Sequence, residues 1–217
     1  GLGDVYKRQA FKAAKRVIDE GGYAVGTKSD LTGGMNSLDK QNVMWGAGIQ
    51  VADQAGGYAG FFTHMDNKEG AYAKSAPKLI SKQLYNRISA TDIRRDWWDP
   101  SDKESPYVSK KFSFANVASF LGDYIYMRVE EMYFTAAEAA LRLDDLKSAR
   151  ELMNTVMAER DPGYSANNRS GTLLGATTTT WTGSFLENIL THRRIELWGE
   201  YGRLFDVRRL GQGIDRR

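Results

Sequence analysis

Two glutamates, Glu196 and Glu200, lie four residues apart in the stretch RRIELWGEYGRLFDVRRLG, residues 193–211. On a helix this spacing places both carboxylates on one side, and paired carboxylates are the chemistry of glycoside hydrolysis. A retaining glycosidase, however, holds its two carboxyl groups ~5–5.5 Å apart, facing each other across the substrate. Five arginines in the same stretch offer these glutamates charge-assisted hydrogen bonds instead. We therefore predict that both glutamates brace a scaffold, and we predict no catalytic residue.

Aromatic residues interleaved with amides and carboxylates suggest a second kind of chemistry, the binding of sugars. A sugar ring presents C–H groups on one face and hydroxyls around its rim, so its site combines flat aromatic rings with polar side chains. The sequence between residues 42 and 72 supplies both, and its glycines let a ligand approach the backbone. The predicted glycan-binding candidates are Trp45, Tyr58, Phe62, Asp66, Asn67, Tyr72 and Trp98.

Core packing is the alternative for each of these aromatic residues. On a helix, Tyr58, Phe61 and Phe62 would form one apolar stripe of the kind that faces a core. Trp97 and Trp98 are adjacent and cannot both face one way, so we expect one to be buried and the other exposed.

The composition argues against several other classes of protein. A hydrophobic content of 41% and a charged content of 26% are typical of globular domains, and no apolar run approaches the ~20 residues of a membrane span. The 30 basic and 27 acidic residues are interspersed, which gives nucleic-acid binding little support. With no cysteine and two distant histidines, no metal site is predicted. The common nucleotide-binding and hydrolase motifs are missing from the sequence, so no cofactor is predicted either.

The elements that must position these residues are clearest from residue 123 to residue 160. Apolar residues step there by three or four positions, as on one face of a helix: Ile125, Val129, Met132, Ala136, Ala140 and Leu143. Asp144-Asp145 predicts a turn with a helix cap, and a second amphipathic helix follows. Two helices joined by so short a turn predict a hairpin of the tetratricopeptide type.

Further helices are predicted at 10–22, at about 185–198 behind a Ser184 cap, and at 203–210. Residues 163–183 predict a long loop. Residues 23–122 are rich in turn signals and predict a loop-rich region. The short elements predicted in it are helices at 58–65, 76–88 (with Pro77 in its first turn) and 90–98, and strands within 43–51 and 110–114.

Several stretches resemble one known family. THRRIELWGEYGRLFDVRRLG (191–211), preceded by YIYMRVEEMYFTAAEAALRLDDLKSARELMNTV (124–156), is similar to the C-terminal half of the SusD/RagB family, the glycan-binding outer-membrane lipoproteins. AAKRVIDEGGYAV (13–25), NVMWGAGIQVADQAGGYAGFFTHMD (42–66) and LYNRISATDIRRDWW (84–98) resemble other parts of the same family. The resemblance covers residues 10–215.

The resemblance implies a mainly α fold: a SusD-like superhelix of tetratricopeptide-like hairpins with an irregular, glycan-facing insert. Residues 1–217 are expected to form one partial SusD-like domain: a scaffold helix at 10–22, the loop-rich glycan-facing region at 23–122 and tetratricopeptide-like helices at 123–211. We interpret residues 1–9 as translated sequencing-adaptor sequence. The resemblance also assigns a structural role to Glu196, Glu200, Phe205, Asp206, Arg208 and Arg209.

By the same resemblance, the function is expected to be non-catalytic glycan binding at the cell surface and delivery to a SusC-type TonB-dependent transporter of the outer membrane. Membrane attachment would come only from an N-terminal lipid anchor, which we expect to be lost, with the first hairpins, from this fragment. The alternative is a tetratricopeptide-type adaptor that binds another protein.

Overall fold

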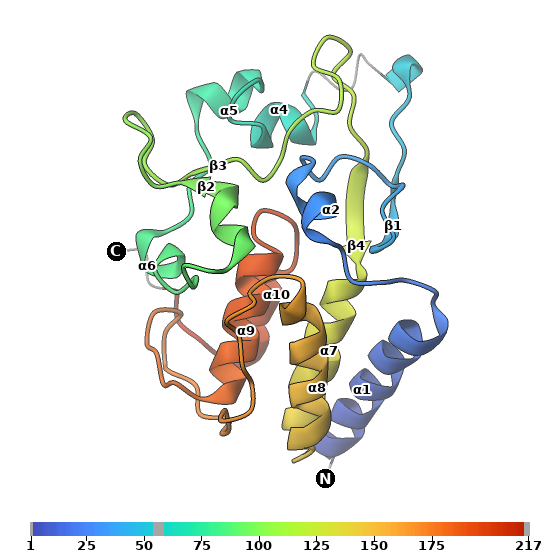
Figure 1. Ribbon diagram of the computed structural model, residues 1–217, viewed down its shortest axis with the longest axis vertical. Helices are drawn as coiled ribbons and strands as arrows, with labels where there is room; N and C mark the ends of the chain where they lie inside the picture. The colour runs from blue at the N-terminus through green and yellow to red at the C-terminus, as the bar shows by residue number, and fades with distance from the viewer. Residues whose placement is uncertain (1, 54–58, 215–217) are drawn as a thin grey trace. The chain divides into compact units, whose positions relative to one another are not determined.

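The computed structural model describes residues 2–53 and 59–214 (Figure 1). The chain divides into two compact units. Gly1–Ala24 and Val129–Arg217 form what we call the helical unit, and Val25–Arg128 form the loop-rich unit. Within the described residues, no helix is both long enough and apolar enough to cross a bilayer.

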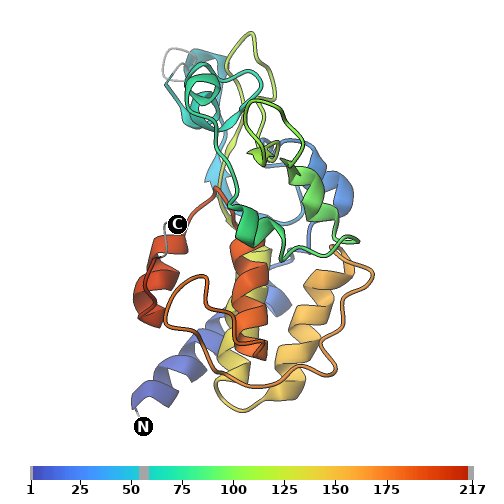
Figure 2. The ribbon, with the colours of Figure 1, turned by 90° about the vertical axis from the view of Figure 1, so that its left-hand side faces the viewer.

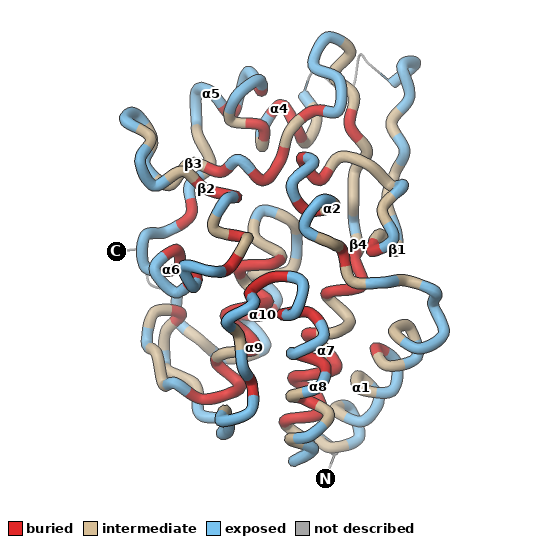
Figure 3. The backbone as a smooth tube through the Cα atoms, viewed as in Figure 1, coloured by how far each residue is buried: buried red, intermediate tan, exposed pale blue. Residues whose placement is uncertain are grey.

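The helical unit is built around one central helix. Its helices are α1 (Leu2–Glu20), α7 (Val129–Leu141), α8 (Leu146–Ala158), α9 (Phe185–Glu196) and α10 (Arg203–Leu210). α7 packs against α1, α8 and α9, which surround it in Figures 1 and 2. Most of α7 is buried (Figure 3), and its alanines Ala136, Ala137 and Ala140 leave room for close helix packing.

α7 and α8 form the predicted hairpin. Asp144 adopts a left-handed φ of 64° at the turn, and Asp145 caps α8 by accepting a hydrogen bond from the Ser148 N–H at 3.0 Å. Ser184 caps α9 in the same way, accepting from the Glu187 N–H at 3.1 Å. These caps confirm the predicted starts of both helices.

The start of α7 differs from the prediction of a helix from residue 123. Tyr124–Arg128 form a strand, β4, and the helix begins at Val129. Ile125 and Val129 are four apart, which fits a helical stripe, but YIYMR also supports a strand because its β-branched and aromatic residues favour pairing. The pairing partner, β1 (Val43–Ala47), lies far away in the sequence and decides the outcome.

The loop-rich unit contains only short elements, as predicted. They are α2 (Lys28–Thr32), β1, η1 (Val51–Asp53), α4 (Phe61–Met65), α5 (Ala71–Ser75), α6 (Lys82–Tyr85), η2 (Ile93–Trp97), β2 (Trp98–Asp99), β3 (Val108–Ser109) and β4. β1 pairs antiparallel with β4, and β2 with β3. Helices with short strands therefore make up the described fold, and the predicted fold class is confirmed.

Two predicted elements of this unit are wrong in detail. The helix expected at 76–88 is only α6, which begins after the Ser81 cap. Pro77 instead precedes an extended segment, in which the Ser109 N–H donates to the Lys78 carbonyl and Leu79 bridges Val108. That pairing also places the strand at Val108–Ser109 rather than at 110–114.

Candidate functional site

An exposed aromatic pair stands on the two-stranded sheet of the loop-rich unit. Trp45 on β1 is 62% exposed and Tyr126 on β4 is 44% exposed. Their ring centroids lie 5.1 Å apart at an interplanar angle of 63°, an edge-to-face contact. Such a pair gives each ring a defined orientation while leaving flat apolar surface open to a ligand.

The sheet positions this pair through an irregular register. Trp45 lies opposite Met127 and the next residue, Gly46, lies opposite Ile125, so the register shifts between them. A Cβ atom at Gly46 would lie 2.4 Å from the Tyr124 carbonyl oxygen. Glycine is therefore required beside Trp45, because any side chain would push β1 away from β4.

Tyr72 offers a second exposed ring, on α5. It is 43% exposed and stacks on the His64 ring of α4, with centroids 4.7 Å apart and an angle of 7°. The stack covers one face of the tyrosine ring with an imidazole. Tyr72 thus remains a candidate for sugar contact, as predicted from the sequence.

Phe62 and Trp98 are not exposed platforms, contrary to the prediction. Phe62 is buried against Phe61 and Phe114, and a Cβ atom at Gly122 would meet its ring at 2.5 Å. Trp98 is buried together with Trp97, so the expected split between one buried and one exposed tryptophan is wrong. These rings are part of the core of the loop-rich unit, where Phe62 also packs against Phe114 from a distant segment.

Of the other candidates, Tyr58 lies outside the described residues. The side chains of Asp66 and Asn67 form hydrogen bonds to the backbone of other segments. Asp66 is buried; its Oδ1 accepts from the N–H groups of Lys68 and Glu69, and its Oδ2 accepts from the Phe114 N–H. Asn67 accepts from the Lys78 N–H at 2.8 Å and donates to the Ser109 carbonyl at 2.8 Å. Asp66 is therefore buried, with both carboxylate oxygens bonded to backbone N–H groups, which corrects its predicted role as an exposed sugar ligand.

These two residues instead shape a cleft of about 750 Å³ within the loop-rich unit. Its apolar surface comes from Pro77, Phe112, Phe114 and Val117, and its polar rim includes Lys68, Lys110 and Glu104. An apolar surface with a polar rim is the general character of a small-molecule site. Within residues 2–53 and 59–214, no group of three or more histidine, aspartate or glutamate side chains could hold a metal ion.

Comparisons with known proteins identify the family and the fold of the chain. The family model described as the SusD family matches residues 58–214. The chain belongs to the SusD family. The resemblance seen in the sequence is thereby confirmed. No protein of curated function matches the chain.

Solved structures from the genus Bacteroides share the fold of this SusD-family chain. A SusD-like carbohydrate binding protein from Bacteroides vulgatus is 25% identical with a TM-score of 0.74; the match covers 97% of this chain and 43% of that one. A SusD superfamily protein from Bacteroides thetaiotaomicron is 19% identical with a TM-score of 0.69, covering 98% and 48%. Surface glycan-binding protein A from Bacteroides uniformis is 18% identical with a TM-score of 0.62, covering 95% and 45%. The chain therefore spans less than half the length of these relatives.

In this SusD-family chain, Glu196 is part of a buried ion-pair cluster. The Arg160 guanidinium contacts both Glu196 oxygens at 3.0 Å and Glu130 at 2.8 Å, and all three side chains are fully buried. A carboxylate held in this way cannot reach a substrate. The predicted scaffold role of Glu196 is confirmed, although its partner Arg160 lies in the turn just after α8 rather than in the 193–211 stretch.

A second set of ion pairs joins α7, α9 and α10. Arg193 pairs with Glu131 at 2.7 Å and with Asp206 at 3.1 Å, and Arg209 contacts Glu138 at 2.7 Å. Burial would raise the pKa of Glu138, but hydrogen bonds and charge from Arg209 lower it below its usual value. These pairs support the structural role expected of Asp206 and Arg209.

Phe205 and Arg208 depart from that expected bracing role. Phe205 is 57% exposed on α10, where its ring centroid lies 5.8 Å from that of the exposed Tyr201, and Arg208 is also exposed. Asp206 instead pairs with Arg193 of α9, and Arg209, itself partly exposed, pairs with Glu138 of α7.

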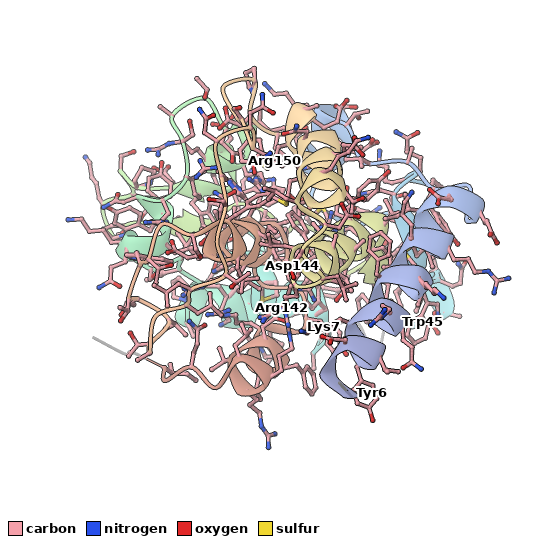
Figure 4. The ribbon with its side chains drawn as sticks, turned by 90° about the horizontal axis from the view of Figure 1, so that it is seen from below. Tyr6, Lys7, Trp45, Arg142, Asp144 and Arg150 are labelled. Carbon is pink, nitrogen blue, oxygen red and sulfur yellow. The ribbon has the colours of Figure 1, made fainter. Side chains whose placement is uncertain are left out.

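A hollow of about 360 Å³ lies over the same ion pairs, between α1 and the residues of α7, α9 and α10. Tyr6 and Lys7 of α1, and Arg142 just beyond α7, are among the residues that line it, and Figure 4 labels these three side chains. The arginines that line it are already in ion pairs: Arg142 and Arg209 with Glu138, and Arg193 with Glu131 and Asp206. We therefore assign this hollow to the scaffold.

Proposed function

We propose that this SusD-family chain binds glycans without catalysing their cleavage, and that Trp45 and Tyr126 form the main contact surface. The observation that carries the proposal is the exposed aromatic pair, because apolar rings of this size open to solvent mark a binding surface. Tyr72 supplies a further ring. The names of the Bacteroides vulgatus and Bacteroides uniformis relatives, a carbohydrate binding and a glycan-binding protein, support the same ligand class.

The proposed contacts are weak individually, which suits a protein that must release its ligand. Covering about 75 Å² of one ring contributes about 2 kcal/mol, at about 25 cal/mol per Å². Much of that gain is offset by the cost of ordering the ligand. A polymer with many repeating units compensates for weak single contacts through multivalency.

Delivery of the glycan to a SusC-type TonB-dependent transporter belongs to the same proposal. In it, the full-length protein is a lipoprotein on the surface of the outer membrane of a Gram-negative bacterium. Family membership supports this assignment. Weak, reversible binding fits a protein that passes its ligand on.

The alternative, a tetratricopeptide-type adaptor, gains support from one feature of the helical unit. Tyr201, Leu204 and Phe205 are exposed near the start of α10. Grouped apolar side chains of this kind are common where proteins contact one another. A surface of that kind is compatible with glycan binding by the loop-rich unit.

Affinity electrophoresis on starch, xylan, mannan, β-glucan and pectin tests the proposal. The parent chain is expected to be retarded by at least one polysaccharide, and Trp45→Ala to weaken that binding about 10- to 30-fold, which corresponds to about 1.4–2 kcal/mol. Tyr126→Ala should have a smaller effect. Tyr201→Ala is the matched control, because this tyrosine is exposed but lies in the helical unit.

Two outcomes would count against the proposal. Unchanged retardation of Trp45→Ala and Tyr126→Ala on a polysaccharide that retards the parent would reject the aromatic pair as the site. Release of reducing ends from the retarding polysaccharide, abolished by Glu196→Gln, would replace a binding protein with a glycosidase.

A further inference from the structure

One carboxylate, that of Asp123, ties together the two ends of the segment that carries Trp45. Its Oδ2 accepts a hydrogen bond from the Leu38 N–H at 3.0 Å, and its Oδ1 accepts one from the Ile49 N–H at 3.1 Å. These two residues flank β1 on its N-terminal and C-terminal sides. A single side chain therefore closes the loop that contains the whole strand.

Asp123 is also attached directly to the partner strand. It immediately precedes β4, and its own N–H donates to the Asn36 carbonyl at 2.9 Å. The Asn36 side chain in turn donates to the Ser113 carbonyl at 2.9 Å. The carboxylate is thus fixed relative to Tyr126, which lies three residues farther along β4.

The strand pairing alone leaves the position of Trp45 weakly determined. The register shifts on both sides of Trp45, between Val43 and Trp45 and again between Trp45 and Gly46. A bulge leaves the extra residue unpaired and disrupts the ladder locally, so regular ladder hydrogen bonds do not fix Trp45 by themselves. The bonds from Leu38 and Ile49 to Asp123 supply the missing constraint from outside the ladder.

We propose that Asp123 is the positioning residue of the Trp45–Tyr126 surface, an inference that rests on the proposed glycan-binding function. Only an ionised carboxylate fits the role fully, because both of its oxygens accept hydrogen bonds. An asparagine at this position keeps one acceptor and turns an N–H donor toward the other backbone N–H. An alanine removes both bonds and leaves two backbone donors without their partner.

The test compares Asp123→Asn and Asp123→Ala with Asp39→Asn. Asp39 is an exposed aspartate of the same segment, so its substitution removes the same charge without removing a bond to β1. Three quantities are measured on the whole chain: hydrogen exchange of the Leu38 and Ile49 amides, the ¹⁹F NMR line of 5-fluorotryptophan at position 45, and affinity for the polysaccharide that retards the parent. The ¹⁹F lines of Trp97 and Trp98 report on the core of the same unit.

In Asp123→Asn we expect faster exchange of one of the two amides, a shifted or broadened Trp45 line and affinity about three- to tenfold weaker. Asp123→Ala should expose both amides and weaken binding further. Asp39→Asn should match the parent in all three measurements. The Trp97 and Trp98 lines should stay in place in the Asp123→Asn variant.

Two results would overturn the proposal. The first is parent-like affinity and an unmoved Trp45 line in Asp123→Asn, while Trp45→Ala still weakens binding as expected; the proposed function would then survive without this residue. The second is movement of the Trp97 and Trp98 lines together with that of Trp45, which would make Asp123 a general core contact. Failure of the proposed function itself is recognised separately, by parent-like binding of Trp45→Ala.

Discussion

The Glu130–Arg160–Glu196 cluster of the helical unit and the Trp45–Tyr126 surface of the loop-rich unit use charged and aromatic side chains in opposite ways. In the helical unit, Glu130, Arg160 and Glu196 are fully buried and paired with one another. In the loop-rich unit, Trp45 and Tyr126 are exposed, although large aromatic rings contribute most to a core when buried. From residue type alone, the charged cluster would be expected at the surface and the aromatic rings in the core.

The contrast shows which feature separates scaffold from site in this chain. A buried charge must be paired and hydrogen-bonded, so a cluster of acids and arginines with every member paired has no capacity left for a ligand. An exposed ring, in contrast, retains unused apolar surface that a ligand can cover. Unused binding capacity, rather than chemical reactivity, is therefore the sign of function here.

Removal of the central arginine should give the largest effect and tests the scaffold side of the comparison. Arg160→Met leaves the buried Glu130 and Glu196 carboxylates without this partner, which should lower the free energy of unfolding by about 3–5 kcal/mol. Urea denaturation followed by circular dichroism measures the change. Arg208→Met, at an exposed position of α10, is the control and should change stability by about 0.5 kcal/mol or less. A cost below about 1 kcal/mol for Arg160→Met would contradict burial of the cluster.

The pH dependence of stability gives the next largest effect. The pKa of Glu138 is raised by burial but lowered overall by Arg209, so its ionised form is favoured in the folded state. A lowered folded-state pKa contributes stability above the unfolded value of about 4.3, and this contribution is lost as pH falls through the folded value. Urea denaturation at pH 6, 4.5 and 3 should show stability falling on acidification, with a shallower fall in Glu138→Gln. Parallel pH profiles for the parent and Glu138→Gln would show that the Glu138–Arg209 pair does not contribute to the pH dependence of stability.

Local signals in the sequence are sufficient for several helix boundaries of the scaffold. Ser184 and Asp145 cap their helices as predicted, because capping needs only a neighbour three residues away, and Gly211 ends α10 with a φ of 63°. Family membership also followed from contiguous stretches. The partner of Glu196 could not be predicted in this way, because the arginines beside it in the sequence contact other groups and Arg160 lies 36 residues earlier.

The site was less predictable because exposure depends on contacts between distant segments. Phe62 packs against Phe114, and Trp45 lies on a strand whose partner, β4, is far away in the sequence. Tyr126 was missed because its segment also fits a helical stripe, although the alternation in YIYMR is a usable strand signal. Asp123 gives no local signal, since its bonds reach Leu38 and Ile49.

The smallest expected effect comes from Phe205, which the family resemblance places among the structural residues and the structure leaves 57% exposed. Phe205→Ser should change the free energy of unfolding by about 0.5 kcal/mol or less, because little apolar contact is lost. Phe185→Ser is the matched control: this ring is fully buried in α9, and its loss should cost about 3–5 kcal/mol. Urea denaturation of both variants measures the difference. A cost above about 2 kcal/mol for Phe205→Ser would mean that its ring is buried in solution, and position in the 193–211 motif would then predict structural importance better than exposure does.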